Sequence, residues 1–193
     1  MDIQTAIAEV VKAGKVRHFG LSDDTAWGIM KYNEQAKEHN LPRVESIQNE
    51  FSLLDRSDDP YVAEVCVRDD VAYLPWSPLA MGILSGKYNQ KPWPENSRYE
   101  VAKRIDSDPG FYRHNEESYA AVAAYMAVAE KHGLDVCQMA IKFCDVQNFV
   151  TSTIIGATSM EQLKTDIDAF DIELSDEVMA DIDEVYRQYP IPF

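Results

Sequence analysis

The residues best suited to binding chemistry stand where apolar segments of the chain end. Ser22 and Gln48 offer a hydroxyl group and a carboxamide, which suit a neutral amide group on a ligand. Trp76 offers a flat ring on which a second ring can stack. Together these three side chains match a ligand that carries an amide on an aromatic ring.

Two stretches rich in small residues could bind phosphate groups. The stretch "SPLAMGILSGK" (residues 77–87) combines small side chains, which let backbone N–H groups approach an anion, with the charge of Lys87. The stretch "GATSMEQL" (residues 156–163) places backbone N–H groups at the start of a helix, where the helix dipole favours anions. An amide-bearing ring and two phosphate sites describe a nicotinamide dinucleotide.

Each of these signals also has a plainer structural explanation. Ser159 and Gln162 fit an S-x-x-Q capping box, which accounts for Gln162 without a ligand. Asp23 and Asp24 fit helix caps, and a lone Trp76 is more typical of a protein core. The "SGK" triplet lacks the spacing of a phosphate-binding P-loop. Local sequence alone leaves both interpretations open.

The segments that must position these residues alternate between the hydrophobic periodicity of strands and that of helices. Strands that alternate with helices predict an α/β fold with parallel strands, whose carboxyl ends open on one face where ligands bind. Asp24 is the predicted N-cap of the helix that follows the first strand, and residues 80–116 are predicted to form a long polar loop. Strands are predicted over residues 16–21, 43–49, 71–78 and 151–157, and helices over 4–13, 25–39, 60–69, 117–134 and 135–146 and from Ser159 and Ser175 onward.

Composition and net charge limit the number of domains and the kinds of molecule that the protein could bind. The 193 residues, 46% of them hydrophobic, suffice for one domain over residues 1–193. Lys and Arg number 18 against 33 Asp and Glu, and the net charge of −15 argues against nucleic acid or a membrane surface as partner. Three cysteines without CxxC spacing suggest a cytoplasmic protein, and the four histidines show no paired spacing for a metal site.

Four ordered motifs resemble the second half of the aldo-keto reductases, closest to a bacterial branch and the potassium-channel β subunits. They are "GKVRHFGLS", "IQNEFSLLDR", "LPWSPLAMGILSGKY" and "TIIGATSMEQL". The resemblance implies a (β/α)8 TIM-barrel family, with this chain covering about the last four β/α units as a half barrel. It also implies NADP(H) as cofactor.

Roles for individual residues follow from the same resemblance. Ser22, Asp23 and Gln48 would lie at the nicotinamide carboxamide, and Trp76 would stack on its ring. The remaining predicted cofactor contacts are Ser77, Leu79 and Lys87 at the pyrophosphate, Arg98 at the 2′-phosphate, Gly156, Thr158 and Gln162 at the phosphate and adenosine end, and Asp166 near the adenine.

The Asp, Tyr, Lys and His that the family uses for catalysis come from strands before the fifth, and we find no counterpart for them. We therefore expect no catalytic residue and little or no turnover from this chain alone, which would be a fragment or would complete its barrel by self-association or with a partner chain. A full-length parent would reduce small carbonyl compounds. An alternative is a non-catalytic NADPH-binding regulatory or scaffold subunit, and a third is a chain without function.

Asp23 departs from the family pattern and generates a first prediction. The family usually carries Asn after the serine, and also Asn where this chain has Asp166, so each aspartate replaces an amide donor with a negative charge. We expect Asp23→Asn to strengthen NADPH binding, because it removes repulsion from the anionic cofactor. Calorimetric titration of both proteins with NADPH checks this, and unchanged affinity would mean that residues 22–24 form only a turn.

Overall fold

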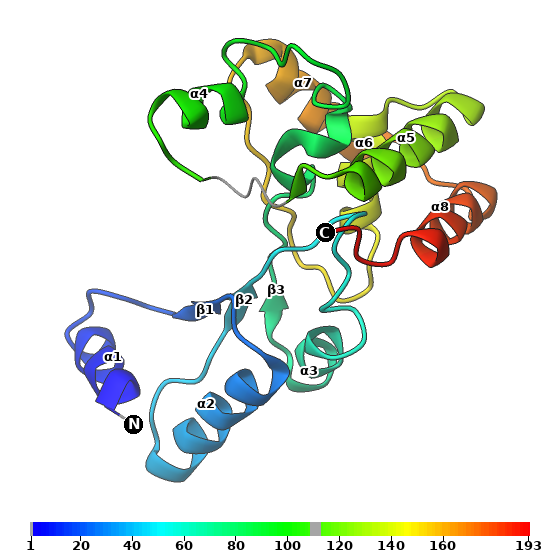
Figure 1. The fold of residues 1–193 in the computed structure, drawn as a ribbon. Coiled ribbons are helices and arrows are strands. Elements are labelled where there is room, and N and C mark those ends of the chain that lie inside the picture. Colours follow the sequence, from blue (N-terminus) through cyan, green and yellow to red (C-terminus); the bar gives the residue numbers. More distant parts are fainter. Residues whose placement is uncertain (1, 109–112) are drawn as a thin grey trace.

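The computed structural model describes residues 2–108 and 113–193 and contains a three-stranded parallel sheet in the order β1-β2-β3 (Figure 1). The strands are β1 (Gly20–Ser22), β2 (Ser46–Gln48) and β3 (Ala72–Tyr73), with Ser22 opposite Gln48 and Ile47 opposite Tyr73. Helices α2 (Ala26–His39) and α3 (Val62–Asp69) connect successive strands. This arrangement confirms the prediction of parallel strands joined by helices.

The first predicted strand is shorter than expected. Residues 15–18 are exposed, with Val16 37% exposed, and regular pairing begins only at Gly20. β1 lies at the edge of the sheet, and no described segment pairs with its outer side. The prediction that residues 16–21 form a buried strand was therefore wrong for its first half.

The fourth predicted strand, over residues 151–157, does not form as regular structure. Val150 makes an isolated parallel bridge to Tyr73, and the backbone N–H groups of Thr151 and Ile154 donate to the carbonyl groups of Tyr73 and Pro75, both at 2.9 Å. These bonds are too few for a continuous ladder. The segment nevertheless runs parallel to β3, on the side of the sheet opposite to β1.

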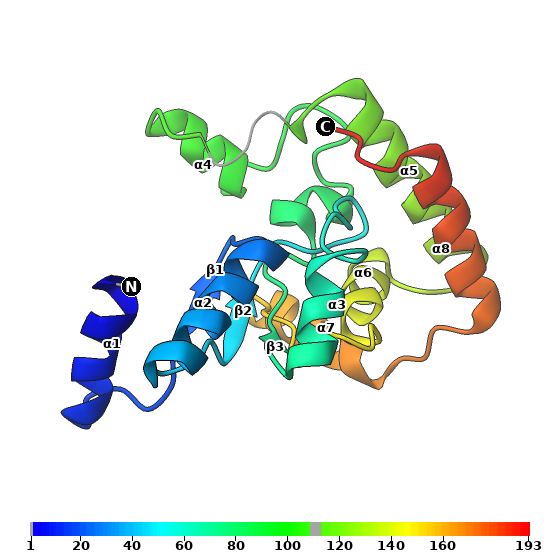
Figure 2. The ribbon, with the colours of Figure 1, turned by 90° about the horizontal axis from the view of Figure 1, so that it is seen from below.

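The remaining helices lie beyond the sheet. In both views α5 (Glu116–Lys131) and α8 (Asp176–Gln188) lie side by side, and α1 (Asp2–Lys12) lies at the end of the molecule near α2 (Figures 1 and 2). Gln4 of α1 is buried and donates to the carbonyl groups of Tyr32 and Pro42. The other elements are α6 (Val136–Asp145), α7 (Met160–Asp168) and the short 3-10 helix η3 (Ala169–Asp171). Among the described helices, none has the length and hydropathy needed to cross a membrane.

Two of the predicted helix N-caps are observed, and a third helix is capped by a different residue. Ser159 and Ser175 cap α7 and α8 as predicted, each accepting a backbone N–H with its side chain. Asp24 is not the N-cap of α2, because Thr25 takes that position and its Oγ1 accepts the Gly28 N–H at 3.1 Å. The backbone of Asp24 is instead bonded to the side chain of Asn49, directly after β2, and the helix begins one residue later than predicted.

The predicted long loop at residues 80–116 contains regular structure. It holds the 3-10 helix η1 (Ala80–Ser85) and helix α4 (Arg98–Arg104), while residues 109–112 lie outside the described residues. Tyr88 and Tyr99 are almost completely buried, at 1% and 0% exposed. Aromatic side chains anchor this segment, so the description as a polar loop was wrong in part.

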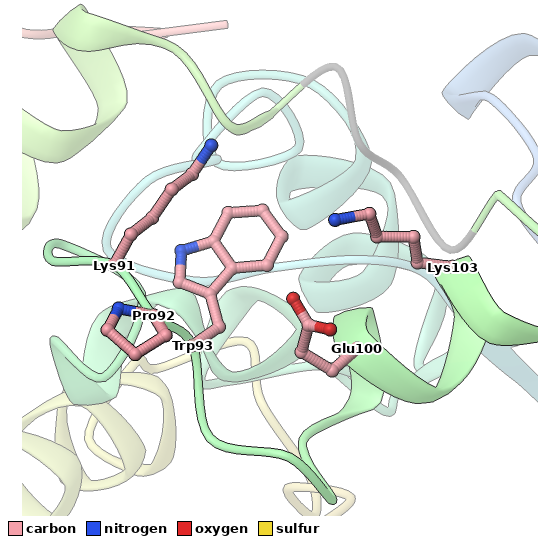
Figure 3. Close-up of a pocket in the computed structure, with 5 residues that line it drawn as sticks. All are labelled: Lys91, Pro92, Trp93, Glu100 and Lys103. Carbon is pink, nitrogen blue, oxygen red and sulfur yellow. The ribbon is translucent and has the colours of Figure 1, made fainter.

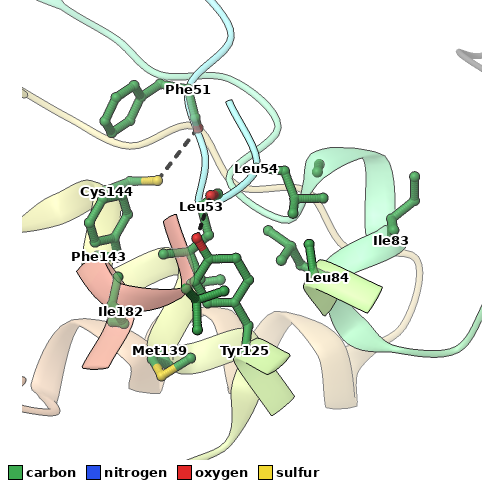
Figure 4. Packing of buried hydrophobic residues seen from close by; sticks show 14 of the residues in the cluster. Phe51, Leu53, Leu54, Ile83, Leu84, Tyr125, Met139, Phe143, Cys144 and Ile182 are labelled. Atoms are coloured by element: carbon green, nitrogen blue, oxygen red, sulfur yellow. Dashed lines mark hydrogen bonds between the residues drawn. The ribbon is translucent and has the colours of Figure 1, made fainter. Parts of the chain in front are cut away.

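The largest part of the hydrophobic core lies between the loop after β2 and helices α5, α6 and α8 (Figure 4). Phe51 stacks on Phe143 of α6 with ring centroids 5.9 Å apart, and the hydroxyl of Tyr125 donates to the carbonyl of Leu53 at 2.9 Å. The loop is thereby held by apolar packing and by hydrogen bonds from side chains of α5 and α6 to its backbone carbonyl groups.

Arg56 links the same loop to two helices. Its guanidinium carbon lies 4.3 Å from the ring centroids of both Phe143 and Tyr186, and it forms an ion pair with Asp183 at 2.9 Å. Its side chain is 6% exposed. A buried guanidinium between two rings contributes packing as well as charge.

We expect Arg56→Ala to lower the free energy of unfolding by about 2 kcal/mol, because it removes buried packing between α6 and α8. Arg68→Ala is the matched control, since Arg68 is 75% exposed and pairs only along its own helix with Glu64. Arg68→Ala should lower the free energy of unfolding by about 0.5 kcal/mol or less. Urea denaturation of the three proteins measures both values, and equal losses would contradict the role assigned to Arg56.

Candidate functional site

Ser22 and Gln48 lie next to each other at the carboxyl ends of β1 and β2. They are register partners, so their side chains leave the sheet on the same face. The Ser22 hydroxyl and the Asp23 backbone N–H both donate to the carbonyl of Gln48, each at 3.1 Å. Both residues are exposed. The structure thus brings together the predicted hydroxyl and carboxamide.

Trp76 reaches the same place from the segment after β3. Its indole Nε1 donates to Oδ1 of Asp23 at 3.0 Å, and its backbone N–H donates to the carbonyl of Asn49 at 2.9 Å. The backbone of Asp23 lies in the left-handed region, with φ 53°, so the chain turns at this residue and does not continue as an extended strand. The carboxylate of Asp23 therefore anchors the ring, and an asparagine carbonyl could accept the same hydrogen bond.

A partly buried polar network, which no sequence pattern signalled, supports the carboxyl ends of the strands. The Asn49 carboxamide accepts from the Asp24 N–H at 3.3 Å and donates to the Asp24 carbonyl at 2.9 Å and to Oδ2 of Asp58 at 2.7 Å. The Tyr73 hydroxyl donates to the same oxygen at 2.7 Å. Burial raises the pKa of Asp58, while these two donors act in the opposite direction. The network joins the segments that follow β1 and β2 to β3.

Glu50 forms a second buried polar contact beside Trp76. It bridges to Trp76 through the backbone, and its carboxylate pairs with Arg113, which is 2% exposed. Burial raises the pKa of Glu50, and the charge of Arg113 opposes that change. The Arg113 guanidinium lies 4.9 Å from the ring of Phe193. No pattern in the sequence signals this pairing, because its partners are 63 residues apart.

The first predicted phosphate segment follows directly from Trp76. Ser77 has φ 53° in the left-handed region, Leu79 packs half-buried against the core, and Lys87 is exposed beyond η1. Lys87 forms no ion pair with any residue in the described ranges. A side chain at Gly82, where φ is 93°, would come within 3.3 Å of the Lys87 ammonium. The small residues therefore leave room for the lysine.

Lys87 and Asp166 approach the same part of α6. Burial raises the pKa of Cys137 to about 12, with Asp135 and Asp166 adding to the effect and Lys87 opposing it. Both predicted residues thus lie within charge interaction of one thiol. Asp166 is 4% exposed, and burial raises its pKa. Its carboxyl group has little surface to offer a ligand.

The predicted adenosine residues occupy the start of α7. The Ser159 hydroxyl accepts the Gln162 N–H at 3.2 Å, as in a capping box, but Gln162 Oε1 accepts from the backbone N–H and the hydroxyl of Thr158, at 2.9 and 3.0 Å, and not from the N–H of Ser159. Gly156 is exposed, with nothing within 4 Å of where a side chain would begin. Arg98 is exposed on the first turn of α4, and within the part of the chain that the structure describes it forms no ion pair with another predicted residue.

Several groups near the carboxyl ends of the strands remain accessible, and they suit the ligand that the sequence predicts. The side chain of Gln48 makes no hydrogen bond to a described residue and can pair with an amide, while Trp76 is only partly buried and offers ring surface. Lys87 and the open backbone at Gly156 suit phosphate oxygens. Within the described ranges no three His, Cys, Asp or Glu residues are grouped for a metal ion.

Comparison with known proteins identifies a family. Residues 1–187 match the model of the aldo/keto reductase family. The chain is 43% identical over 192 residues to Protein tas of Escherichia coli (strain K12), covering 100% of this chain and 54% of that protein. It is 31% identical over 168 residues to an aldo-keto reductase of Babesia bovis, covering 84% of this chain and 57% of that protein.

A more distant relative is a putative aryl-alcohol dehydrogenase of Schizosaccharomyces pombe, 25% identical over 190 residues, with 98% of this chain and 52% of that protein covered. The chain spans about half the length of the curated relatives it matches.

The hydrogen bond between Asp23 and Trp76 generates a prediction for the ligand-free protein. Asp23→Ala removes the acceptor of the indole N–H, so we expect faster local motion of the ring and a stability loss of about 1 kcal/mol. Asp23→Asn keeps a carbonyl acceptor and should change neither. Fluorescence anisotropy decay in a Trp27→Phe, Trp93→Phe background isolates Trp76, and identical decays for the Ala and Asn variants would refute the anchoring role.

Proposed function

The chain belongs to the aldo/keto reductase family, and from this premise we propose that its protein is an NADP(H)-dependent oxidoreductase that reduces aldehydes or ketones to alcohols. The observation that carries the proposal is the meeting of Ser22, Gln48 and Trp76 at one edge of the sheet. A bound nicotinamide would supply the hydride. The side chains of this chain would bind and orient it.

We propose that the cofactor lies along the carboxyl ends of the strands. Ser22 and Gln48 would hold the carboxamide, and Trp76, fixed by Asp23, would support the ring. The negative charge of Asp23 weakens this binding. The phosphate and adenosine part would contact Ser77, Leu79, Lys87, Arg98, Gly156, Thr158 and Gln162.

We also propose that the chain corresponds to the last four β/α units of the family's barrel. The parallel pairing of β1, β2 and β3 and the parallel course of residues 150–154 support this assignment. The outer side of β1 would accept another strand, from a second copy or a partner chain.

The three cysteines, all free thiols, suit a reducing compartment such as the cytoplasm.

NADPH titration tests the cofactor proposal. We expect Gln48→Ala and Lys87→Ala each to weaken binding about tenfold, because each removes a polar group that faces the cofactor. Lys37→Ala, which changes an exposed lysine on α2, is the matched control and should leave the affinity unchanged. Calorimetry measures all four proteins, and the absence of NADPH binding to the unmodified chain would overturn the proposal.

Two further measurements separate binding from turnover. Trp76→Phe should remove the quenching of tryptophan emission by NADPH, whereas Trp27→Phe, which changes a side chain 71% exposed on α2, should not. The isolated chain should not consume NADPH when an aromatic aldehyde is added, because it lacks the family's catalytic tyrosine. Steady loss of NADPH absorbance would contradict that part of the proposal.

A further inference from the structure

The segment from Lys87 to Arg104 concentrates positive charge in an acidic protein. It holds five Lys or Arg residues and two Glu, a local balance of 5 − 2 = +3, whereas the whole chain carries −15. A local cluster of one sign raises the concentration of oppositely charged small molecules near it. This segment is therefore a place where an anion can approach an otherwise repelling surface.

A pocket of about 650 Å³ opens in this segment (Figure 3). Its volume is typical of small-molecule sites. The side chains of Lys91 and Lys103 extend on opposite sides of the Trp93 indole, and Glu100 lies on the same side as Lys103 (Figure 3). The lining residues are Lys91, Pro92, Trp93, Glu100 and Lys103, none of which is a predicted cofactor contact.

The indole of Trp93 is held in place from behind. Its Nε1 donates to the carbonyl of Tyr88 at 3.0 Å, and its ring meets Tyr88 and Tyr99 edge to face at centroid distances of 5.5 and 6.1 Å. The ring of His114 lies 4.6 Å away at a 38° tilt. Because these neighbours fix the indole while part of it stays exposed, a ligand ring can stack without first ordering it.

The charges at the pocket are not paired with one another. Lys91 Nζ lies 5.4 Å from the centroid of Trp93, and within the described residues neither Lys91 nor Lys103 forms an ion pair. Burial and the charge of Lys91 lower the pKa of His114 to about 4, so this histidine is neutral at pH 7. Two lysines and Glu100 leave a lining charge of +1, which matches a ligand with one negative charge.

We propose that this pocket is a binding site for a small aromatic acid with a single negative charge, separate from the cofactor site at the sheet edge. The ring of the ligand stacks on Trp93, and its carboxylate pairs with Lys91 or Lys103. The assignment stands independently of the proposed reductase activity, since it uses none of the residues at the strand ends.

The test uses 4-nitrobenzoate, whose nitroaryl ring quenches tryptophan emission. In the full chain carrying Trp27→Phe and Trp76→Phe, Trp93 is the remaining tryptophan, and its emission should be quenched with saturation. The neutral analogue 4-nitrobenzyl alcohol should bind several-fold more weakly. Lys91→Gln and Lys103→Gln should each weaken 4-nitrobenzoate binding about two- to fivefold, which is the effect of losing one solvent-exposed ion pair.

Controls separate this site from general charge effects. Lys37→Gln, which removes an exposed lysine of α2, should leave the affinity unchanged, and Glu100→Gln should raise it. Circular dichroism of each variant confirms that the fold is retained. Equal binding of the acid and the alcohol, no effect of either pocket lysine, or displacement of 4-nitrobenzoate by NADPH would each overturn the proposal.

Discussion

The arrangement of the strand ends depends on the side chain of one buried residue, Asn49. Its carboxamide bonds both backbone groups of Asp24 and the carboxylate of Asp58, which in turn accepts the hydroxyl of Tyr73. Strands of two or three residues have few ladder bonds, so this network supplies the missing connections. An apolar residue at position 49 would leave the half-buried Asp58 with the Tyr73 hydroxyl but without its amide donor. The turn that carries Ser22 and Asp23 is positioned through these bonds.

The same edge gathers carboxylates that interact with one another. Asp23 and Asp55 both raise the pKa of Glu50 and of Asp58, in addition to the effect of burial. These increases in pKa are opposed at Asp58 by the hydrogen bonds from Asn49 and Tyr73, and at Glu50 by the charge of Arg113. The cations of residues 87–104 lie elsewhere in the chain, and Lys87 is the one that follows η1 directly. The protein thus carries negative charge at the carboxyl ends of the strands and a net positive charge in the segment from Lys87 to Arg104.

Much of the fold and the first half of the candidate site followed from the sequence, because both depend on local patterns. Alternating strands and helices predicted parallel pairing, and parallel pairing placed Ser22, Gln48 and Trp76 at one edge. Strand lengths could not be predicted in the same way. A hydrophobic run such as residues 16–21 reports the preference for burial, whereas a strand exists only where a neighbouring segment completes its ladder. Within residues 2–108 and 113–193, β1 is paired on one side only, and residues 151–157 pair with β3 through a few bonds.

What the sequence could not reveal are contacts between side chains that no short-range pattern connects. Tyr88, Trp93, Tyr99 and His114 read as scattered aromatic residues in a polar loop, yet their rings pack together with centroids 3.9 to 6.1 Å apart. Glu50 gives no sign that Arg113 will meet it. Asp24 and Thr25 are both good helix caps, and the choice between them is made by Asn49, 25 residues away from Asp24. In each case a residue's role is set by a partner distant in sequence, which local propensity does not encode.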